Sequence, residues 1–143
     1  MSRLQVTPNR CSGCRSCEMA CAFAHAVSEP AGATASLGLQ PGRPRLRIWA
    51  SPGAAFIPML CLQCDDARCV RACAYGALAR SETTGAIELD SRRCTRCLLC
   101  TAACPFGNVE LEAAMGGLVV KCDLCHGAPA CAKFCPTGAL AWS

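Results

Sequence analysis

Sixteen of the 143 residues are cysteines, and this constrains the fold more than any other feature of the sequence. They form four groups of four with none left over: Cys11, Cys14, Cys17 and Cys21; Cys61, Cys64, Cys69 and Cys73; Cys94, Cys97, Cys100 and Cys104; Cys122, Cys125, Cys131 and Cys135. So high a cysteine fraction in a short chain indicates disulfide bonds or bound metal. Only 5% of the residues are aromatic, so the core is small and whatever the cysteines bind is expected to stabilise the fold.

The groups repeat in an alternating order. The first and third read CSGCRSCEMAC and CTRCLLCTAAC, with the spacing C-x2-C-x2-C-x3-C. The second and fourth read CLQCDDARCVRAC and CDLCHGAPACAKFC, in which the middle gap widens to four and five residues. This ABAB order is expected from duplication of a two-motif unit.

The spacing is typical of iron–sulfur ligation. C-x2-C-x2-C-x3-C-P is a ferredoxin signature in which the first three cysteines hold one [4Fe–4S] cube and the fourth holds another. The third group matches it completely, with Pro105 after Cys104, while Ala22 and Ala74 replace the proline in the first two groups. On a helix the x3 gap puts both sulfurs on one face, about 6 Å apart along the axis. Neighbouring cubes would then lie on the order of 10 Å apart, within reach of electron tunnelling.

Other uses of these cysteines fit the pattern less well. Zinc sites also use C-x2-C pairs, but zinc does not account for the x3 gap closed by proline. Disulfide bonds are disfavoured because residues 1–6 show no export signal, which favours a cytoplasmic location. A thioredoxin-like site would need a βαβ pattern around it. The alternatives of another class that stay open are a structural zinc protein and a cluster-assembly protein.

Charge and hydropathy argue against two kinds of partner. The formal net charge of +4 counts the cysteines as neutral. Each [4Fe–4S] cube with four thiolates carries about −2, so four cubes would bring the net charge to about −4. We therefore expect no nucleic-acid binding. The sequence has no run of eighteen apolar residues, so we expect no membrane span.

We expect an α+β fold of short helices, small β-hairpins and long loops. The x3 gaps predict helices at 17–21, 69–73, 100–104 and 131–135. Hydrophobic runs around turn residues predict two hairpins, one from 77–80 with 86–90 and one from 109–111 with 118–121. The 39 residues between Cys21 and Cys61 are rich in Ala, Gly, Pro and Ser, and predict a long functional or interface loop with one strand at 45–49.

The chain resembles the four-cluster electron-transfer subunits of modular redox complexes. The resemblance rests on the four groups in this order and on the segments FIPMLCLQCDDARCVRAC and KCDLCHGAPACAKFCPTGAL. Members of that family serve molybdenum or tungsten pterin oxidoreductases, carbon monoxide dehydrogenases, formate hydrogenlyases and related hydrogenases. The resemblance implies one polyferredoxin unit over 1–143 made of two nested ferredoxin-like dicluster modules. The outer module is 1–60 with 105–143 and carries the first and fourth groups, and the inner module is 61–104 and carries the second and third.

The resemblance also implies which cysteines share a cluster. Cluster 1 is held by Cys11, Cys14, Cys17 and Cys135; cluster 2 by Cys122, Cys125, Cys131 and Cys21; cluster 3 by Cys61, Cys64, Cys69 and Cys104; cluster 4 by Cys94, Cys97, Cys100 and Cys73. The hairpin expected between the second and third groups supports the inner pairing independently, because that link has the length and turn signals of a two-cluster ferredoxin. The replacement of proline by Ala74 bears on loop rigidity and not on ligation.

The function implied by the resemblance is non-catalytic electron transfer through four [4Fe–4S] clusters. The partners implied are a catalytic oxidoreductase subunit and a further electron-transfer subunit or soluble acceptor. The chain lacks long inserts and a C-terminal membrane-facing extension, which favours a cytoplasmic complex. A small subunit of a tungsten aldehyde oxidoreductase fits the size best, followed by the carrier of a carbon monoxide dehydrogenase or a hydrogenase. The partner's identity, and whether copies stack to join their clusters, stay open.

Two histidines and a lysine are candidates for roles near the clusters. His25 and His126 could replace a thiolate, as in Rieske centres. With sixteen cysteines available, we instead expect each histidine at the surface or beside a ligand. Lys121 directly precedes the fourth group, and either raises a cluster potential by its charge or is an ordinary solvated lysine.

Three arginines and two tryptophans also stand out. Arg43, Arg45 and Arg47 alternate along the expected strand and predict an exposed face, with docking of an acidic partner as the alternative. Trp49 and Trp142 are expected to be packing residues and not electron relays. No phosphate loop, Ser-His-Asp set or pair of catalytic carboxylates can be assembled, so no catalytic residue is expected.

Overall fold

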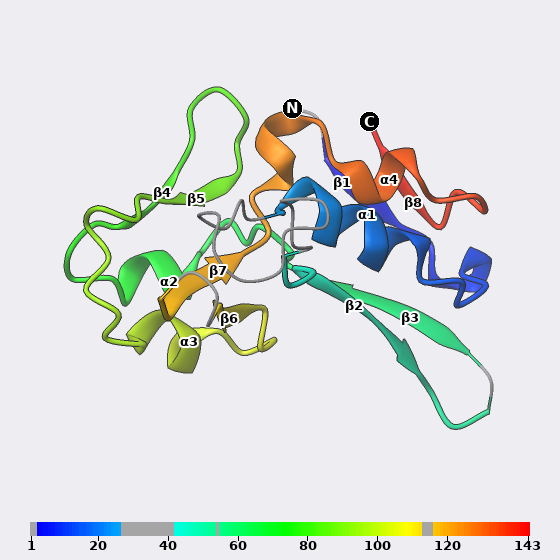
Figure 1. Ribbon diagram of the computed structural model, residues 1–143, viewed down its shortest axis with the longest axis horizontal. Coiled ribbons are helices and arrows are strands. Elements are labelled where there is room, and N and C mark those ends of the chain that lie inside the picture. Colours follow the sequence, from blue (N-terminus) through cyan, green and yellow to red (C-terminus); the bar gives the residue numbers. More distant parts are fainter. Residues whose placement is uncertain (1–2, 27–41, 54, 113–115) are drawn as a thin grey trace, which may run out of the picture.

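The structure, a computed structural model, describes residues 3–26, 42–53, 55–112 and 116–143. It consists of short helices and two-stranded antiparallel ribbons (Figure 1). In chain order the elements are β1 (Leu4–Val6), the 3-10 turn η1 (Pro8–Arg10), α1 (Ser16–Ala24), β2 (Leu46–Ala50), β3 (Phe56–Leu60), α2 (Arg68–Arg71), β4 (Leu78–Arg80), β5 (Ile87–Leu89), α3 (Leu99–Ala103), β6 (Val109–Glu112), β7 (Leu118–Lys121), the 3-10 turn η3 (Leu124–Gly127), α4 (Ala130–Lys133) and β8 (Leu140–Trp142). The ribbons pair β1 with β8, β2 with β3, β4 with β5 and β6 with β7. These short helices and small strand pairs confirm the expected α+β class.

The helices and hairpins expected from the cysteine groups are present. Helix α1 carries both cysteines of its x3 gap, while α2, α3 and α4 are four or five residues long and end before the second cysteine. The two predicted hairpins are β4–β5 and β6–β7, and the predicted strand at 45–49 is β2. Part of the predicted long loop, residues 27–41, lies outside the described residues.

Two strand pairings were not expected from the sequence. Strand β3 pairs with β2 although it contains Pro58, which lies opposite Ile48. A two-stranded ribbon tolerates proline because each strand has one edge without a partner. Strands β1 and β8 join the two ends of the described chain, with Leu4 opposite Trp142 and Val6 opposite Leu140.

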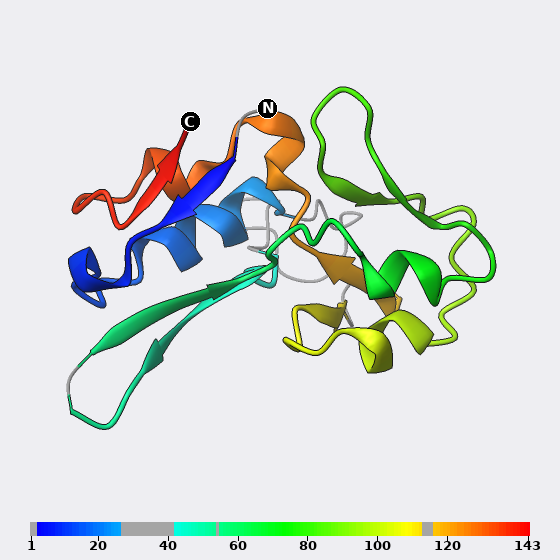
Figure 2. The ribbon, with the colours of Figure 1, turned by 180° about the vertical axis from the view of Figure 1, so that it is seen from behind.

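The interior is divided into two hydrophobic cores, and cysteines belong to both. The first core contains Cys17, Cys21, Leu46, Ile48, Leu60, Cys131 and Leu140. The second core contains Cys69, Leu78, Ile87, Cys100, Val109 and Val119. Both views place α1, α4, β1 and β8 at one end of the molecule and α2, α3 and β4–β7 at the other, with the β2–β3 ribbon extending away (Figures 1 and 2). The first core thus combines residues from both ends of the described chain with β2 and β3, and the second core is built from residues 69–119.

Candidate iron–sulfur centres

The sixteen thiols converge in sets of four. Three of these sets line cavities of about 280, 20 and 10 Å³, and each set takes three cysteines from one group and one from another. The cavity members are Cys61, Cys64, Cys69 and Cys104 in the first; Cys94, Cys97, Cys100 and Cys73 in the second; and Cys11, Cys14, Cys17 and Cys135 in the third. The remaining cysteines gather around Cys131, whose electrostatic neighbours are Cys122, Cys21 and Cys125. The structure therefore places the predicted cysteines close to one another, and which of them share a cluster stays a prediction.

Burial and backbone hydrogen bonds shift the pKa of these thiols in opposite directions. Burial raises the pKa of Cys17 to about 11 and that of Cys131 to about 12. Burial would also raise the pKa of Cys73 and Cys135, but backbone N–H groups outweigh it and lower both. Ligation requires deprotonated sulfur, so a buried set is stable in charged form only with a bound cation.

The last cysteine of three groups accepts a hydrogen bond from the backbone. The N–H groups of Arg45, Ala77 and Leu140 donate to the sulfurs of Cys21, Cys73 and Cys135 over 3.2, 3.3 and 3.5 Å. These are the cysteines that join a set formed mainly by another group. Hydrogen bonds to the sulfurs are one of the means by which a protein adjusts an iron–sulfur potential.

Left-handed backbone is concentrated in the cysteine motifs. Among the described residues, every non-glycine residue with positive φ lies within one of the four groups: Arg15, Gln63, Arg96, Leu98, Leu124, Cys125 and His126. The position two residues after the first cysteine has positive φ in all four groups, with glycine there only at Gly13. Such conformations cost of order 1–3 kcal/mol each and persist where a site requires them. Alternating right- and left-handed residues point successive N–H groups into a concavity that suits an anion, as at many iron–sulfur sites.

A polar network surrounds the Cys21 sulfur. His25 Nδ1 lies 3.7 Å from that sulfur and 2.9 Å from the Cys21 carbonyl oxygen, and its Nε2 lies 3.1 Å from Asp123 Oδ1. Arg45 donates to the other Asp123 oxygen at 2.8 Å. The hydrogen bond with Asp123 and then that with Cys21 raise the pKa of His25 to about 10. Burial would raise the pKa of Asp123, but His25 and Arg45 hold it well below its usual range.

The two histidines therefore differ in environment. His25 is mostly buried beside a cysteine, as expected, whereas the His126 side chain is 75% exposed. His25, Asp123 and Cys125 could hold a metal ion by geometry. Since Cys125 also belongs to a set of four thiols, this group is interpreted as part of the surroundings of that set.

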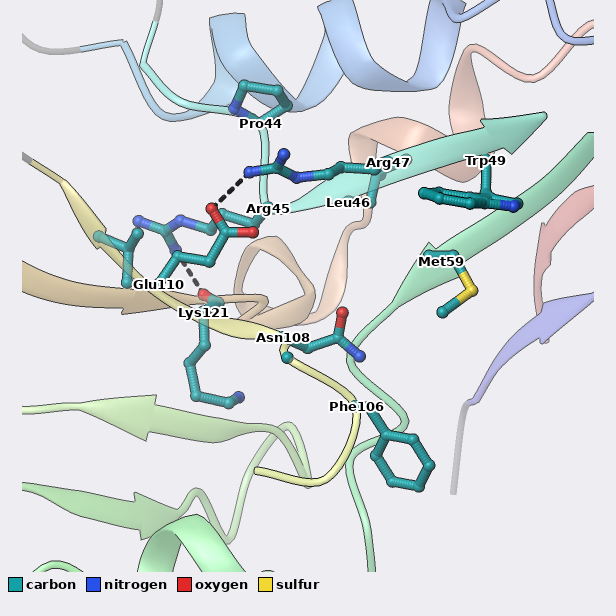
Figure 3. Close-up of a pocket in the computed structure, with 12 residues that line it drawn as sticks. Pro44, Arg45, Leu46, Arg47, Trp49, Met59, Phe106, Asn108, Glu110 and Lys121 are labelled. Atoms are coloured by element: carbon teal, nitrogen blue, oxygen red, sulfur yellow. Dashed lines mark hydrogen bonds and ion pairs between the residues drawn. The ribbon is translucent and has the colours of Figure 1, made fainter. Parts of the chain in front are cut away.

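The arginines of the 43–47 segment are paired within the chain. Arg43 and Arg47 both contact Glu110 at 2.6 Å, and Arg45 is bound to Asp123 at 2.8 Å. Figure 3 shows the Arg47–Glu110 pair. The expectation of an exposed face is therefore wrong for Arg45, whose side chain is only 15% exposed. Trp49 is 63% exposed, which contradicts its expected packing role. It lies on a cavity of about 180 Å³ between the β2–β3 and β6–β7 ribbons (Figure 3).

The donor sets fit [4Fe–4S] clusters. Such clusters are held by four cysteine thiolates, which is the set that the structure gathers at each centre. The crossing of one cysteine between groups, the positive-φ backbone in each motif and the backbone N–H donors to sulfur all suit an anionic cube. Isolated zinc sites would need no such crossing.

Comparison with known proteins agrees with this chemistry. Residues 53–143 match the family described as 4Fe-4S dicluster domain, and residues 8–24 match the one described as 4Fe-4S binding domain. The chain belongs to the 4Fe-4S dicluster domain family. Together the two matches include all sixteen cysteines of this dicluster-family protein. Family membership favours [4Fe–4S] clusters over the zinc alternative.

Two curated relatives have names that describe redox subunits. The chain is 38% identical over 95 residues to the polyferredoxin-like subunit of aliphatic sulfonate oxidoreductase from Pyrococcus furiosus, covering 66% of this chain and 49% of that protein. It is 39% identical over 103 residues to the beta subunit of NADH-dependent phenylglyoxylate dehydrogenase from Aromatoleum evansii, covering 70% of this chain and 21% of the relative. The chain spans about half or less of the length of these relatives.

A solved structure has a similar fold. The active site complex BamBC of benzoyl coenzyme A reductase contains a chain with a TM-score of 0.52 and 24% identity to this dicluster-family protein, covering all of this chain and 76% of that one. At this identity the likeness supports the fold alone. In the part of this chain that the structure describes, no helix has the length and apolar character needed to cross a bilayer.

Proposed function

We propose that this dicluster-family protein holds four [4Fe–4S] clusters and transfers electrons as a non-catalytic subunit of an oxidoreductase complex. The observation that carries the proposal is the exchange of one cysteine between motifs in every set of four. Each [4Fe–4S] cluster supplies a centre that accepts and releases one electron. The ligand sets are those of clusters 1 to 4 as defined above.

The protein's own elements hold these centres in a row. Cys17 and Cys21 both lie on α1 but belong to clusters 1 and 2, so one helix fixes the spacing of that pair. Cys69 on α2 and Cys100 on α3 are each followed, just after the helix ends, by a cysteine that crosses over, Cys73 to cluster 4 and Cys104 to cluster 3. Cys61 is an electrostatic neighbour of Cys122, which brings cluster 3 next to cluster 2. The proposed order along the molecule is therefore 1, 2, 3, 4.

The two ends of the row are the most accessible. Two of the sixteen cysteines are exposed, Cys14 of the proposed cluster 1 and Cys97 of the proposed cluster 4. Electrons are expected to enter at one of these ends and leave at the other, and the direction of flow is not specified by the geometry. We propose the same nested modules, 1–60 with 105–143 and 61–104, with the β6–β7 ribbon packed through Val109 and Val119 onto the inner core.

The proposed partners are a catalytic subunit of the tungsten or molybdenum pterin class and a second electron-transfer subunit or soluble acceptor in the cytoplasm. Support comes from the relatives named as oxidoreductase subunits. A tungsten aldehyde oxidoreductase is the favoured complex. The second candidate is a carrier for a hydrogenase-type complex, favoured by 36% identity over 90 residues to formate hydrogenlyase subunit 2 of Escherichia coli.

Metal analysis of anaerobically purified protein tests the proposal. We expect about sixteen irons and sixteen acid-labile sulfides per chain, four electrons taken up in a reductive titration, and paramagnetic signals from the reduced protein. Zinc without sulfide would contradict iron–sulfur function, and about eight irons would contradict the count of four. Purification from the native host, with identification of the subunit that co-purifies, tests the partner class separately.

A further inference from the structure

One charged side chain is buried next to the proposed cluster row. Among the described residues, Lys121 is the only polar or charged residue in the buried class, at 4% exposed. It ends strand β7 and directly precedes Cys122. The sequence left open whether this lysine is an ordinary solvated one, and its burial excludes that interpretation.

The Lys121 ammonium group contacts carbonyl oxygens and no carboxylate. Its Nζ donates to the carbonyl of Ile87 in β5 at 2.7 Å and to that of Cys122 at 2.6 Å. No ion pair in the described part of the chain includes it. Figure 3 shows the side chain directed away from Trp49 and Met59, on the opposite side of its own backbone.

The carboxylate nearest in sequence already has partners. Asp123 is bound by Arg45 at 2.8 Å and by His25 at 3.1 Å, and Arg45 also donates to the Lys121 carbonyl. Among the described residues, Lys121 therefore has no carboxylate partner that neutralises its charge. Burial of an uncompensated ammonium is unfavourable, and neutral carbonyl groups offset only a part of its free-energy cost.

The Lys121 ammonium group lies beside two of the proposed sites. Ile87, whose carbonyl accepts from Nζ at 2.7 Å, lines the cavity of Cys61, Cys64, Cys69 and Cys104, the proposed ligands of cluster 3. The other acceptor is the carbonyl of Cys122, a proposed ligand of cluster 2. The lysine therefore stands between the two central sites of the proposed row.

We propose that the anionic centres themselves are the counter-charge of Lys121, and that Lys121 raises the reduction potentials of clusters 2 and 3. The inference rests on the proposed function, since it requires those two sites to be loaded. Reduction makes a site more negative by one charge, and a fixed positive charge beside it stabilises the reduced form. The charge of Lys121 thereby shifts an electron on the row toward the centre, relative to the same row without that charge. Lys121 acts on the clusters through its charge and takes no part in ligation.

The test compares midpoint potentials in loaded, anaerobic protein carrying Lys121→Gln, Lys121→Met or Lys121→Arg. Gln keeps N–H donors for the carbonyl groups and removes the charge, Met removes both, and Arg keeps the charge. The control is Lys133→Met, which removes an exposed lysine on α4. Potentials are followed by paramagnetic resonance during a redox titration, with iron content measured on the same samples.

We expect two of the four potentials to move to more negative values in the Gln and Met variants, with the other two unchanged. The Arg variant and the control are expected to keep all four potentials at their wild-type values. Unchanged potentials in fully loaded Gln variant, or equal shifts of all four, would overturn the inference. If the uncharged variants lose iron, retention of iron by Arg supports charge compensation, whereas loss in all three variants refutes it. Wild-type protein without clusters would refute the proposed function instead, so the two failures are distinct.

Discussion

Truncation of Leu140 is expected to release half of the iron before the other half. Leu140 is 2% exposed and packs in the first core with Cys17, Cys21 and Cys131, which belong to clusters 1 and 2. Removal of three carbons from a leucine buried this completely costs about 3 kcal/mol, including the cavity that is left. The backbone N–H of Leu140 still donates to Cys135 in an alanine variant, so the loss is one of packing.

The matched control lies in the second core. Leu78 is also 2% exposed and packs with Cys69 and Cys100 of clusters 3 and 4. A third variant at Leu111, which is 40% exposed, is expected to change stability by less than about 0.5 kcal/mol. Together the three separate the effect of each core from the effect of losing a leucine.

The assay measures iron captured by an anaerobic ferrous chelator across a urea series. A loss of about 3 kcal/mol and a urea dependence of 1–3 kcal/mol per molar shift a midpoint by about 1–3 M. In Leu140→Ala and in Leu78→Ala, half of the iron is expected to be released at a lower urea midpoint. In the double variant, all of the iron is expected to be released at a lower urea midpoint. Release of all the iron in one shifted step from either single variant would refute the division into two cores.

Two further outcomes follow from the sites. Cys11→Ala and Cys135→Ala are each expected to remove about four irons, because both cysteines are proposed ligands of cluster 1. The variant with both changes is expected to lose no more iron than either single variant. Iron analysis of the variant that combines Cys11→Ala with Cys122→Ala should instead give a loss of about eight irons. Asp123→Asn removes the carboxylate of a mostly buried ion pair and is expected to lower the free energy of unfolding by about 3 kcal/mol, whereas Asp66→Asn, in a pair that is 69% exposed, should cost under about 1 kcal/mol in the same urea titration.

The cysteine groups determine the local structure near them, and this part was predictable. The x3 gap predicts α1, α2, α3 and α4, because helical spacing brings cysteines four positions apart to one face, although only α1 includes both cysteines. The β4–β5 and β6–β7 hairpins were predictable as well, since each has its own turn residues between two hydrophobic runs. Local signals also predict that α2 and α3 lie near each other, because one short hairpin connects their cysteine groups.

The pairings that depend on distant segments have no local signal. Strand β1 meets β8 because both cover the first core, and three-residue strands are too short for a periodic pattern. Pro58 has no N–H to donate, but the edge of a two-stranded ribbon needs no donor from it. The burial of Lys121 could not be read from composition either, because its environment is formed by Ile87 of β5 together with the following cysteine. Exposure of Trp49 likewise follows from the β2–β3 ribbon extending away from the rest of the molecule.

The proposed nesting of one module inside the other would impose little entropic cost. The inner pairing of Cys61 with Cys104 closes a loop of 44 residues, and the outer pairing of Cys11 with Cys135 closes one of 125 residues. The difference in loop-closure free energy is about 0.9 kcal/mol, because this cost grows only with the logarithm of length. Formation of the inner core shortens the outer loop further, since it holds the middle of the chain in place. The β1–β8 ribbon and Leu140 then stabilise the outer closure. The long-range crossing of cysteines that joins clusters into a row is thus compatible with a chain of this size, because a single buried leucine contributes more than the additional loop costs.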